Sequence, residues 1–161
     1  MSMPVISKDD IKEFLYDKLG AADASAAKML GIISFDVVYS IIENYLDRGK
    51  SVIIDCPFFV VFAKDRVAAM LAVHPEGRIF ELHCELSELV RNERFNNRID
   101  TAERHVVHRT GDTSLPKPQT ELEAIYAPLE VGPVIRVNTN HFGITEYEQL
   151  LEKLNATIGE K

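Results

Sequence analysis

The chain has 161 residues, 46% of them hydrophobic, which suits one domain with a filled core and is too short for two comfortable ones. A net charge of −7 disfavours a broad electrostatic grip on nucleic acid, so we do not expect an extended nucleic-acid partner. The N-terminus lacks a signal-peptide pattern, and residues 52–63, the longest apolar stretch, are broken by Asp55 and Pro57. With only two separated cysteines, these features predict a cytoplasmic protein with no membrane span.

The first third of the chain predicts helices around short extended segments. Residues 4–6 lead into a helix that Ser7 caps and Gly20 ends. Residues 21–33 are small and apolar and suit a short helix, and residues 35–46 carry a strong amphipathic stripe. Residues 52–54 are continuously apolar, which predicts a strand that is buried on both faces.

The remaining chain alternates in the same way. A helix over 62–73 and a strand over 79–83 are followed by a polar helix from Ser87. Residues 99–118 lack apolar periodicity, so we expect a loop there and a lid over about 87–118. A helix over 120–129, a strand over 134–137 and a helix over 145–154 complete the pattern. The alternation predicts a single α/β domain over 1–161, with a parallel sheet flanked by helices.

Polar side chains follow three of the predicted extended segments. Asp9 comes just after the first, Asp55 ends the second, and Asn138 follows the last. Ligands of parallel α/β sheets bind beyond the carboxyl ends of the strands. The sequence therefore predicts one binding rim that contains these three residues.

Each acid on this rim has two interpretations. Asp55 suits a strand whose terminal acid meets a metal-bound water or a substrate hydroxyl, but many strands end in Asp because it starts a turn. Asp9 and Asp10 complement the dipole of the helix that they begin. Alternatively, Asp9 takes a proton from an acceptor hydroxyl, while Lys12 one turn later orients a phosphate.

Arginine is concentrated in the predicted lid. Five of the nine arginines fall between positions 91 and 109, where lysine is absent. Arginine is favoured over lysine where phosphate is bound through two hydrogen bonds, although a solvated helix face would look similar. Arg91, Arg94 and Arg98 share one helix face by their spacing. We favour a functional role for Arg91 and Arg98.

Three tempting motifs are rejected. Gly49-Lys50-Ser51 lacks the glycine that a Walker A loop needs five residues earlier, and it precedes a strand instead of following one, so we interpret it as a helix end. His105 and His108 have no further ligand at metal-binding spacing. Cys56 has no neighbour in the sequence that would activate a thiol, so we expect a buried small residue.

Three segments carry a family resemblance when they are taken in order: SKDDIK (7–12), RGKSVIID (48–55) and LVRNERFNNR (89–98). Together they resemble the AAA_33-type P-loop kinase-like family, which contains the polynucleotide 5′-kinases and is similar to zeta toxins and chloramphenicol phosphotransferases. The resemblance implies a P-loop NTPase-like, three-layer α/β/α fold. It also implies ATP- and Mg²⁺-dependent phosphoryl transfer to a hydroxyl of a small molecule or nucleotide.

The resemblance also implies residue roles. Asp9 would be the base, Lys12 an acceptor contact and Asp55 the acid of the second central strand. Arg91, Arg94 or Arg98 would reach the transferring phosphate, with Arg91 and Arg98 assigned to catalysis and Arg94 to substrate binding. Arg109 and Asn138 are assigned to the nucleotide cofactor.

One part of the family pattern is missing from the sequence. The family begins with a strand, a phosphate loop and a helix of roughly 25 residues in all, whereas six residues precede Ser7 here. We expect an N-terminally truncated form, with direct pairing of the flanking strands or a partner chain in the gap as alternatives. An open sheet edge would favour a homodimer. Without the loop we expect a weak or inactive kinase; the alternative is a non-catalytic interaction or ligand-binding module on a kinase scaffold.

Overall fold

The protein is described from a computed structural model, and the description covers residues 3–100, 104–108, 119–141 and 143–159. The contacts within the chain divide it into two compact units. Unit 1 comprises Met1–Pro57 and Arg98–Pro116, and unit 2 comprises Phe58–Asn97 and Lys117–Lys161. Each unit is described by itself.

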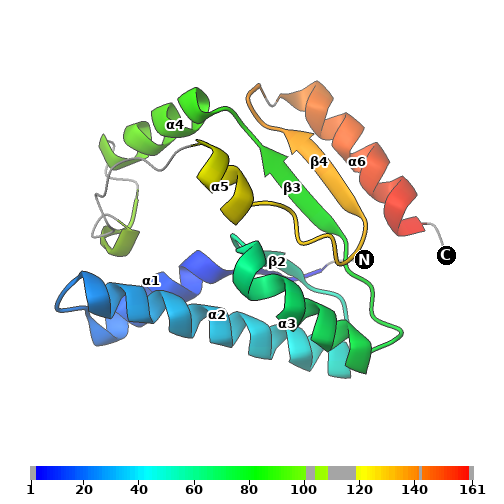
Figure 1. The fold of residues 1–161 in the computed structure, drawn as a ribbon, viewed down its shortest axis with the longest axis horizontal. Helices are drawn as coiled ribbons and strands as arrows, with labels where there is room; N and C mark the ends of the chain where they lie inside the picture. Colours follow the sequence, from blue (N-terminus) through cyan, green and yellow to red (C-terminus); the bar gives the residue numbers. More distant parts are fainter. Residues whose placement is uncertain (1–2, 101–103, 109–118, 142, 160–161) are drawn as a thin grey trace. The chain divides into compact units, whose positions relative to one another are not determined.

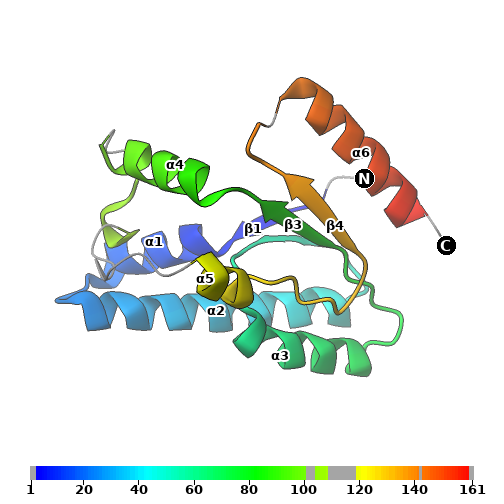
Figure 2. The ribbon, with the colours of Figure 1, turned by 45° about the horizontal axis from the view of Figure 1, so that its top comes forward.

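Unit 1 is built on a pair of parallel strands joined through two helices. Its elements are β1 (Val5–Ser7), α1 (Lys8–Leu19), α2 (Ala24–Asp47), β2 (Ile53–Asp55) and the 3-10 helix η1 (Val106–His108). Parallel strands require a long crossover, and α1 and α2, which lie side by side in both views, supply it (Figures 1 and 2). Val5 pairs with Ile53 and Ser7 with Asp55, so β1 and β2 end at the same edge.

Helix α1 begins and ends where the sequence predicts. The Ser7 side chain accepts a hydrogen bond from the Asp10 N–H, which satisfies one of the free donors of the first turn. Gly20 ends the helix and donates its N–H to the carbonyl of Tyr16. Its φ is 71°, a left-handed value that glycine adopts without a steric penalty.

Helix α2 corrects the prediction of two separate segments at 21–33 and 35–46. It is one helix of 24 residues, capped by Asp23, whose side chain accepts from the Ala26 N–H. Ala27, Leu30, Ser34 and Val38 are buried at three- and four-residue spacing. This stripe runs unbroken through Gly31, and a single glycine costs only about 1 kcal/mol in a helix, so the helix continues.

The end of α2 and the start of β2 bear on the Gly49-Lys50-Ser51 motif and on the expected burial of residues 52–54. The Gly49 N–H, at φ 57°, donates to the Leu46 carbonyl, and Gly49-Lys50-Ser51 lies between a helix and a strand, so the rejection of a Walker A loop is confirmed. The expected burial of residues 52–54 on both faces is wrong. Ile53 is 44% exposed and Ile54 is half-buried, because the described part of β2 has three residues and pairs with β1.

Helix α2 also bears on the expected absence of a membrane span. By length and composition it is the one helix of the described residues that is apolar enough to cross a membrane, with a mean hydropathy of 1.5 over 18 residues. Signal sequences near the N-terminus and the mostly buried core helices of soluble proteins pass the same test, and 28% of this window is buried. The sequence analysis did not consider this segment as a membrane span, because Lys28 and Asp36 interrupt its apolar run.

Unit 2 repeats the parallel pairing with a second set of elements. These are α3 (Val60–Val73), β3 (Glu81–Glu85), α4 (Glu88–Asp100), α5 (Gln119–Ile125), β4 (Val134–Asn138) and α6 (Ile144–Gly159), with α4 continuing into the second stretch of unit 1. β3 and β4 are parallel and end together at Glu85 and Asn138. Ile135 and Val137 on β4 are buried, as is the stripe Ala63, Val67 and Met70 on α3.

The structure therefore confirms a mixed α/β protein with parallel strands. The strands of the described residues form two hydrogen-bonded pairs, β1–β2 and β3–β4. Of the expected lid over 87–118, α4 and η1 are helical, and residues 101–103 and 109–118 lie outside the described part of the chain.

Candidate functional site

The carboxyl ends of β1 and β2 bring two of the predicted acids to one edge of unit 1. Ser7 and Asp55 are paired positions at the ends of the two parallel strands, and Asp9 lies two residues beyond Ser7 in the first turn of α1. The charges of Asp9 and Asp55 both raise the pKa of the Cys56 thiol, so both acids lie near this residue. The predicted proximity of Asp9 and Asp55 is present within this unit.

Asp9 is paired with a buried lysine that the sequence analysis did not single out. Lys8 Nζ lies 3.1 Å from Asp9 Oδ1 and 5.3 Å from the centre of the Phe35 ring. Lys8 is only 8% exposed, whereas Asp10, the other acid of this turn, is exposed. A buried charge needs a partner, and Asp9 supplies it. Asp9 and Asp10 therefore differ in environment although they are adjacent in sequence.

The positive charge around Asp9 sets its ionisation. Burial alone would raise the pKa of Asp9, but the hydrogen bond from Lys8 and the charges of Lys8, His108 and Arg104 hold it below its ordinary value. The Asp9 carboxylate is therefore ionised at neutral pH and below it.

Lys12 joins this cluster from the next turn of α1. Its pKa lies below the ordinary value because it is partly buried and because Lys8 and Arg104 repel its charge, while Asp9 opposes this effect. The Cε atom of Lys12 passes over Gly31 of α2, where an added Cβ would lie 3.8 Å away. We call Lys8, Asp9, Lys12 and Arg104 the Asp9 cluster; three of its four members are cations.

Arg104 belongs to this cluster because η1 is attached to α1. His105 Nε2 lies 3.1 Å from Asp17 Oδ1, and His108 Nε2 lies 3.1 Å from Glu13 Oε1. Glu13 and Asp17 are one turn apart on α1, and Val107 between the two histidines is 1% exposed. Two histidine–carboxylate contacts and one buried valine thus fix the segment that carries Arg104.

The carboxyl edge of β3 and β4 in unit 2 holds the predicted Asn138. Its Oδ1 accepts from the backbone N–H and the side-chain amide of Asn140. Asn140 Oδ1 in turn accepts from the Ser87 N–H at the start of α4. In this structure the Asn138 side chain therefore organises the turn that follows β4.

The two lid arginines of unit 2 contact groups of their own unit. Arg94 donates to the carbonyl oxygens of Thr139 and Asn140, at 2.7 and 3.2 Å. Arg91 lies 3.9 Å from Glu88 on the same helix. Arg94 thus joins α4 to the turn after β4, and Arg91 has the helix-face partner that the alternative interpretation anticipated.

The remaining predicted arginines are Arg98 and Arg109, and the residues of the rejected metal and thiol motifs lie outside the Asp9 cluster. Arg98 is exposed in the last turn of α4, and Arg109 lies outside the described residues. Within the described part of the chain, no three His, Cys, Asp or Glu residues are grouped so that they could hold a metal ion. Burial raises the pKa of Cys56 to about 12, so its thiol stays protonated and is a poor nucleophile, as predicted.

The sequence analysis gave no role to Lys8, Glu13 and Asp17, and it counted Arg104 only as one of the lid arginines whose role it left undecided. The contacts of Glu13 and Asp17 join α1 to a segment about 90 residues further along the chain, and local periodicity carries no information on such pairings. The sequence did contain one signal. Glu13 and Asp17 lie four residues apart and the two histidines lie three residues apart, and both spacings place the side chains on one side of a helical turn.

Comparisons with known proteins were made on the sequence and on the fold. No protein-family model and no curated protein sequence matches this chain. The crystal structure of a protein from Chloroflexus aurantiacus J-10-fl, described as a "putative kinase", is similar in fold, with a TM-score of 0.71 and 25% sequence identity. The similarity covers 94% of this chain and 83% of that one, so this protein has a kinase-like α/β fold.

Proposed function

We propose that this protein is a kinase-like phosphotransferase whose unit 1 holds an acceptor hydroxyl at Asp9. The observation that carries the proposal is the Asp9 cluster at the carboxyl edge of a parallel strand pair. The similarity in fold to the Chloroflexus aurantiacus protein supports it. The proposed acceptor is a small molecule or a nucleotide. We also propose that the protein has the three-layer fold of the P-loop NTPase-like, AAA_33-type proteins and that it acts in the cytoplasm.

The chemistry assigned to unit 1 is removal of a proton from the acceptor. Asp9 is ionised at neutral pH, so its carboxylate would be able to accept the proton of an acceptor hydroxyl held beside it. Lys12 and Arg104 offset the negative charge that gathers on the acceptor side, and Lys8 holds the Asp9 carboxylate in place. Arg91, Arg98 and Arg94 remain proposed contacts to the transferring phosphate, and Arg109 and Asn138 to the nucleotide.

The residues present fit Mg²⁺ better than they fit ATP. Mg²⁺ is commonly held by one or two carboxylates together with substrate phosphates, and the exposed Asp55 at the end of β2 suits that role. The triphosphate of ATP does not fit the start of α1, because Asp9 and Asp10 occupy the turn where a phosphate would need free N–H groups. Nor do the 161 residues contain a Walker A sequence. We therefore expect weak transfer by this chain.

A second candidate function is a non-catalytic ligand-binding module. The observation that favours it is the position of Gly49-Lys50-Ser51, which ends a helix and precedes a strand and so presents no phosphate cradle. Such a module would use the Asp9 cluster to bind an anionic hydroxyl compound without transferring phosphate to it.

Two adjacent aspartates provide a matched test. Asp9→Asn and Asp10→Asn remove the same charge from the same helical turn, but only Asp9 touches Lys8. We expect Asp9→Asn to lower phosphoryl transfer from ATP–Mg²⁺ to hydroxyl acceptors by at least about a hundredfold, as for a lost general base, and Asp10→Asn to leave it unchanged. Equal transfer by the two variants would contradict the proposal.

Calorimetry with ATP–Mg²⁺ separates the two candidates. The titration is made on this chain and on any longer form of it that the genomic sequence encodes in frame. Binding of ATP–Mg²⁺ by the extended form supports the phosphotransferase and allows the transfer assay to be run on it. If neither form binds ATP–Mg²⁺, the phosphotransferase is wrong and the ligand-binding module is favoured.

A further inference from the structure

Lys8 and Lys12 lie on the same side of α1, but their ammonium groups differ in their partners. The two residues are four positions apart, which places one above the other along the helix. Lys8 is buried, and its Nζ lies 3.1 Å from Asp9 Oδ1. Lys12 is half-buried, and among the described residues its Nζ makes no hydrogen bond or ion pair. The nitrogen of Lys12 is therefore not held by an acid.

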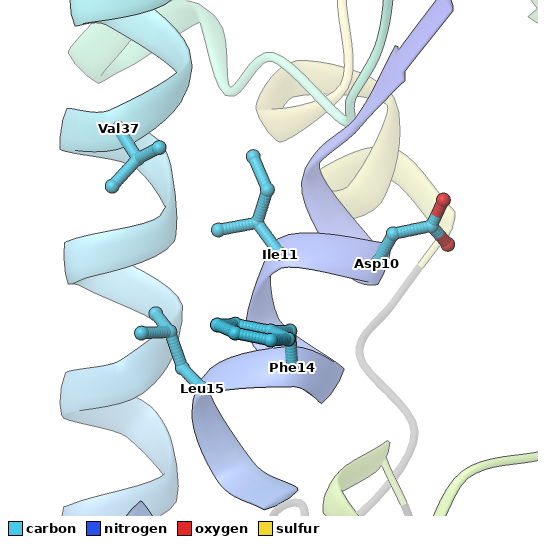
Figure 3. A pocket seen from close by; sticks show the side chains of 5 residues that line it. All are labelled: Asp10, Ile11, Phe14, Leu15 and Val37. Atoms are coloured by element: carbon cyan, nitrogen blue, oxygen red, sulfur yellow. The ribbon is translucent and has the colours of Figure 1, made fainter. Parts of the chain in front are cut away.

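The side chain of Lys12 lies against α2. Its Cε atom passes over Gly31, and a Cβ added there would still be 3.8 Å from it, so the glycine leaves room for the lysine stem. Figure 3 shows that Asp10, two residues before Lys12, directs its carboxylate away from α2. Of the two acids in the first turn of α1, Asp9 is the one whose charge acts on Lys12. Asp10 is therefore a control for the effect of Asp9 on this lysine.

The surroundings of Lys12 favour its neutral amine. Burial disfavours the ammonium form, and the charges of Lys8 and Arg104 repel it, while Asp9 opposes these effects only in part. The pKa of Lys12 is therefore below its ordinary value, and a larger fraction of this lysine than of an ordinary one is uncharged at neutral pH. A lysine that is partly desolvated beside other cations is activated as a nucleophile in this way. The same cations attract negatively charged reactants.

We propose that Lys12 is a nucleophilic amine that forms an imine with small carbonyl compounds that carry an anionic group. The Lys12 nitrogen adds to the carbonyl carbon, and both hydrogens of the amine leave with the carbonyl oxygen as water. The step needs no oxidant or reductant, and hydrolysis reverses it. The positive charges of Lys8 and Arg104 would attract the anionic group of the reactant. This reactivity goes beyond the proposed phosphoryl transfer, because it requires neither ATP nor an acceptor hydroxyl.

Reductive trapping with glyoxylate tests the proposal on the whole chain. Sodium cyanoborohydride converts each imine into a stable secondary amine, and peptide mass spectrometry then gives the labelling rate of each lysine. Lys18 serves as the internal standard, since it lies on the same helix and is exposed. Near neutral pH we expect Lys12 to be labelled at least about threefold faster than Lys18. Lys8 should be the slowest of the three, because Asp9 holds its ammonium group.

Acetaldehyde and a pH series provide the controls on the unchanged protein. The ratio of Lys12 to Lys18 labelling cancels the intrinsic reactivity of the reagent. With glyoxylate this ratio should be at least about threefold higher than with acetaldehyde, which is neutral, because the cations attract the carboxylate. Raising the pH from about 7 to about 10 should lower the ratio, since ordinary lysines then lose their protons as well. Neither control depends on the folding of a variant.

Asp9→Asn distinguishes this reactivity from the proposed phosphoryl transfer. The variant removes the charge that favours protonated Lys12, so labelling of Lys12 should rise at least about twofold, whereas phosphoryl transfer should fall. Asp10→Asn should leave the labelling of Lys12 unchanged, because the Asp10 carboxylate is directed away from α2 (Figure 3). Far-UV circular dichroism and thermal melting check that both variants are folded. Rapid labelling of Lys12 in a chain that transfers no phosphate would support this proposal and contradict the proposed function.

Four outcomes would overturn the proposal. Lys12 is labelled no faster than Lys18 near neutral pH, or the ratio of their labelling rates does not change with pH. Glyoxylate and acetaldehyde give the same ratio, so that the cations do not select an anionic compound. Finally, a folded Asp9→Asn variant is labelled more slowly at Lys12 than the unchanged protein, which would mean that Asp9 does not oppose loss of the Lys12 proton.

Discussion

His108 on η1 and Glu13 on α1 are joined by a contact of 3.1 Å between Nε2 and Oε1, across 95 positions of the sequence. A second contact of the same kind joins His105 Nε2 to Asp17 Oδ1. The Nδ1 atom of His105 accepts from the Val107 N–H, so a neutral His105 carries its proton on Nε2 and donates it to Asp17. These histidines are therefore structural, and they hold Arg104 beside Asp9.

The first prediction is that His108 makes stability fall as the pH is lowered from 7 to 5.5. Burial, together with the charges of Lys12 and Arg104, holds the pKa of His108 below its ordinary value, although Asp9 and Glu13 act in the opposite direction. Between the two pKa values the unfolded chain therefore binds a proton that the folded protein does not. Urea unfolding should show that His108→Gln costs less stability at pH 5.5 than at pH 7.

Glu13→Gln is the matched control for this prediction. It keeps an oxygen that accepts from the His108 N–H and removes the charge that favours protonated His108. The pKa of His108 should then fall further, so the loss of stability should steepen as the pH is lowered. A His108→Gln variant whose cost grows at low pH would instead indicate an ion pair between a protonated His108 and Glu13, which would contradict the predicted sign.

The second prediction concerns the two thiols. Because the pKa of Cys56 is raised to about 12, its thiolate fraction at pH 8 is on the order of 10⁻⁴. Cys84 is exposed on β3. Iodoacetamide at pH 8 should therefore alkylate the folded protein once, at Cys84, as identified by peptide mass spectrometry. Cys84→Ser should then react only when the protein is unfolded, and rapid alkylation of Cys56 in that variant would be inconsistent with its burial.

Local structure was predictable from the sequence wherever one residue determines it. Ser7 and Gly20 bound α1 as expected, because capping depends on a side chain and a backbone conformation that are visible in the sequence. The extent of α2 was not predictable, because a helix continues as long as tertiary packing buries one side of it, and Ser34 in that buried stripe does not look apolar. Ser34 remains in the core because its hydroxyl donates to the Leu30 carbonyl.

The candidate site was predictable in part for a similar reason. Asp9 and Asp55 were found because the ends of parallel strands meet, a rule that needs only the order of elements. The assignment of Arg94 to substrate stays a prediction. In this structure Arg94 donates to the backbone after β4, and an arginine pattern is the same whether its partner is a phosphate or a carbonyl. Lys8 was overlooked because its burial depends on Phe35, 27 positions away.

The third prediction compares two glycines. A Cβ on Gly132 would clash with the Ile79 carbonyl oxygen, a backbone atom that cannot move aside cheaply, whereas a Cβ on Gly31 would meet only Lys12 Cε at 3.8 Å. Gly132→Ala should therefore destabilise the protein by about 1–3 kcal/mol. Gly31→Ala lies inside α2 and should stabilise it by about 0.5–1 kcal/mol. Urea unfolding of both variants measures the difference, and an equal effect would contradict the packing at Gly132.

The fourth prediction concerns the approach to β4. Both carboxylate oxygens of Glu81 accept backbone hydrogen bonds, from Leu129 at 3.0 Å and Glu130 at 3.2 Å. Glu130 has φ 55°, a left-handed conformation that is unfavourable for a residue with a side chain, and these bonds help to hold it. Glu81→Ala should cost about 1–3 kcal/mol, because the N–H of the buried Leu129 loses its acceptor, and Glu81→Gln should cost less because one oxygen remains.

Glu130→Gly tests the same turn by removing the strain of a side chain at positive φ while Glu81 is kept. Glycine adopts φ 55° freely, so this variant should unfold at the same urea concentration as the unchanged protein or at a higher one. In a Glu130→Gly background, Glu81→Ala should also cost less, since the turn no longer needs the carboxylate to hold a strained residue. If Glu81→Ala costs nothing in either background, the carboxylate does not hold this turn; an equal cost in both would show that it acts through Leu129 alone.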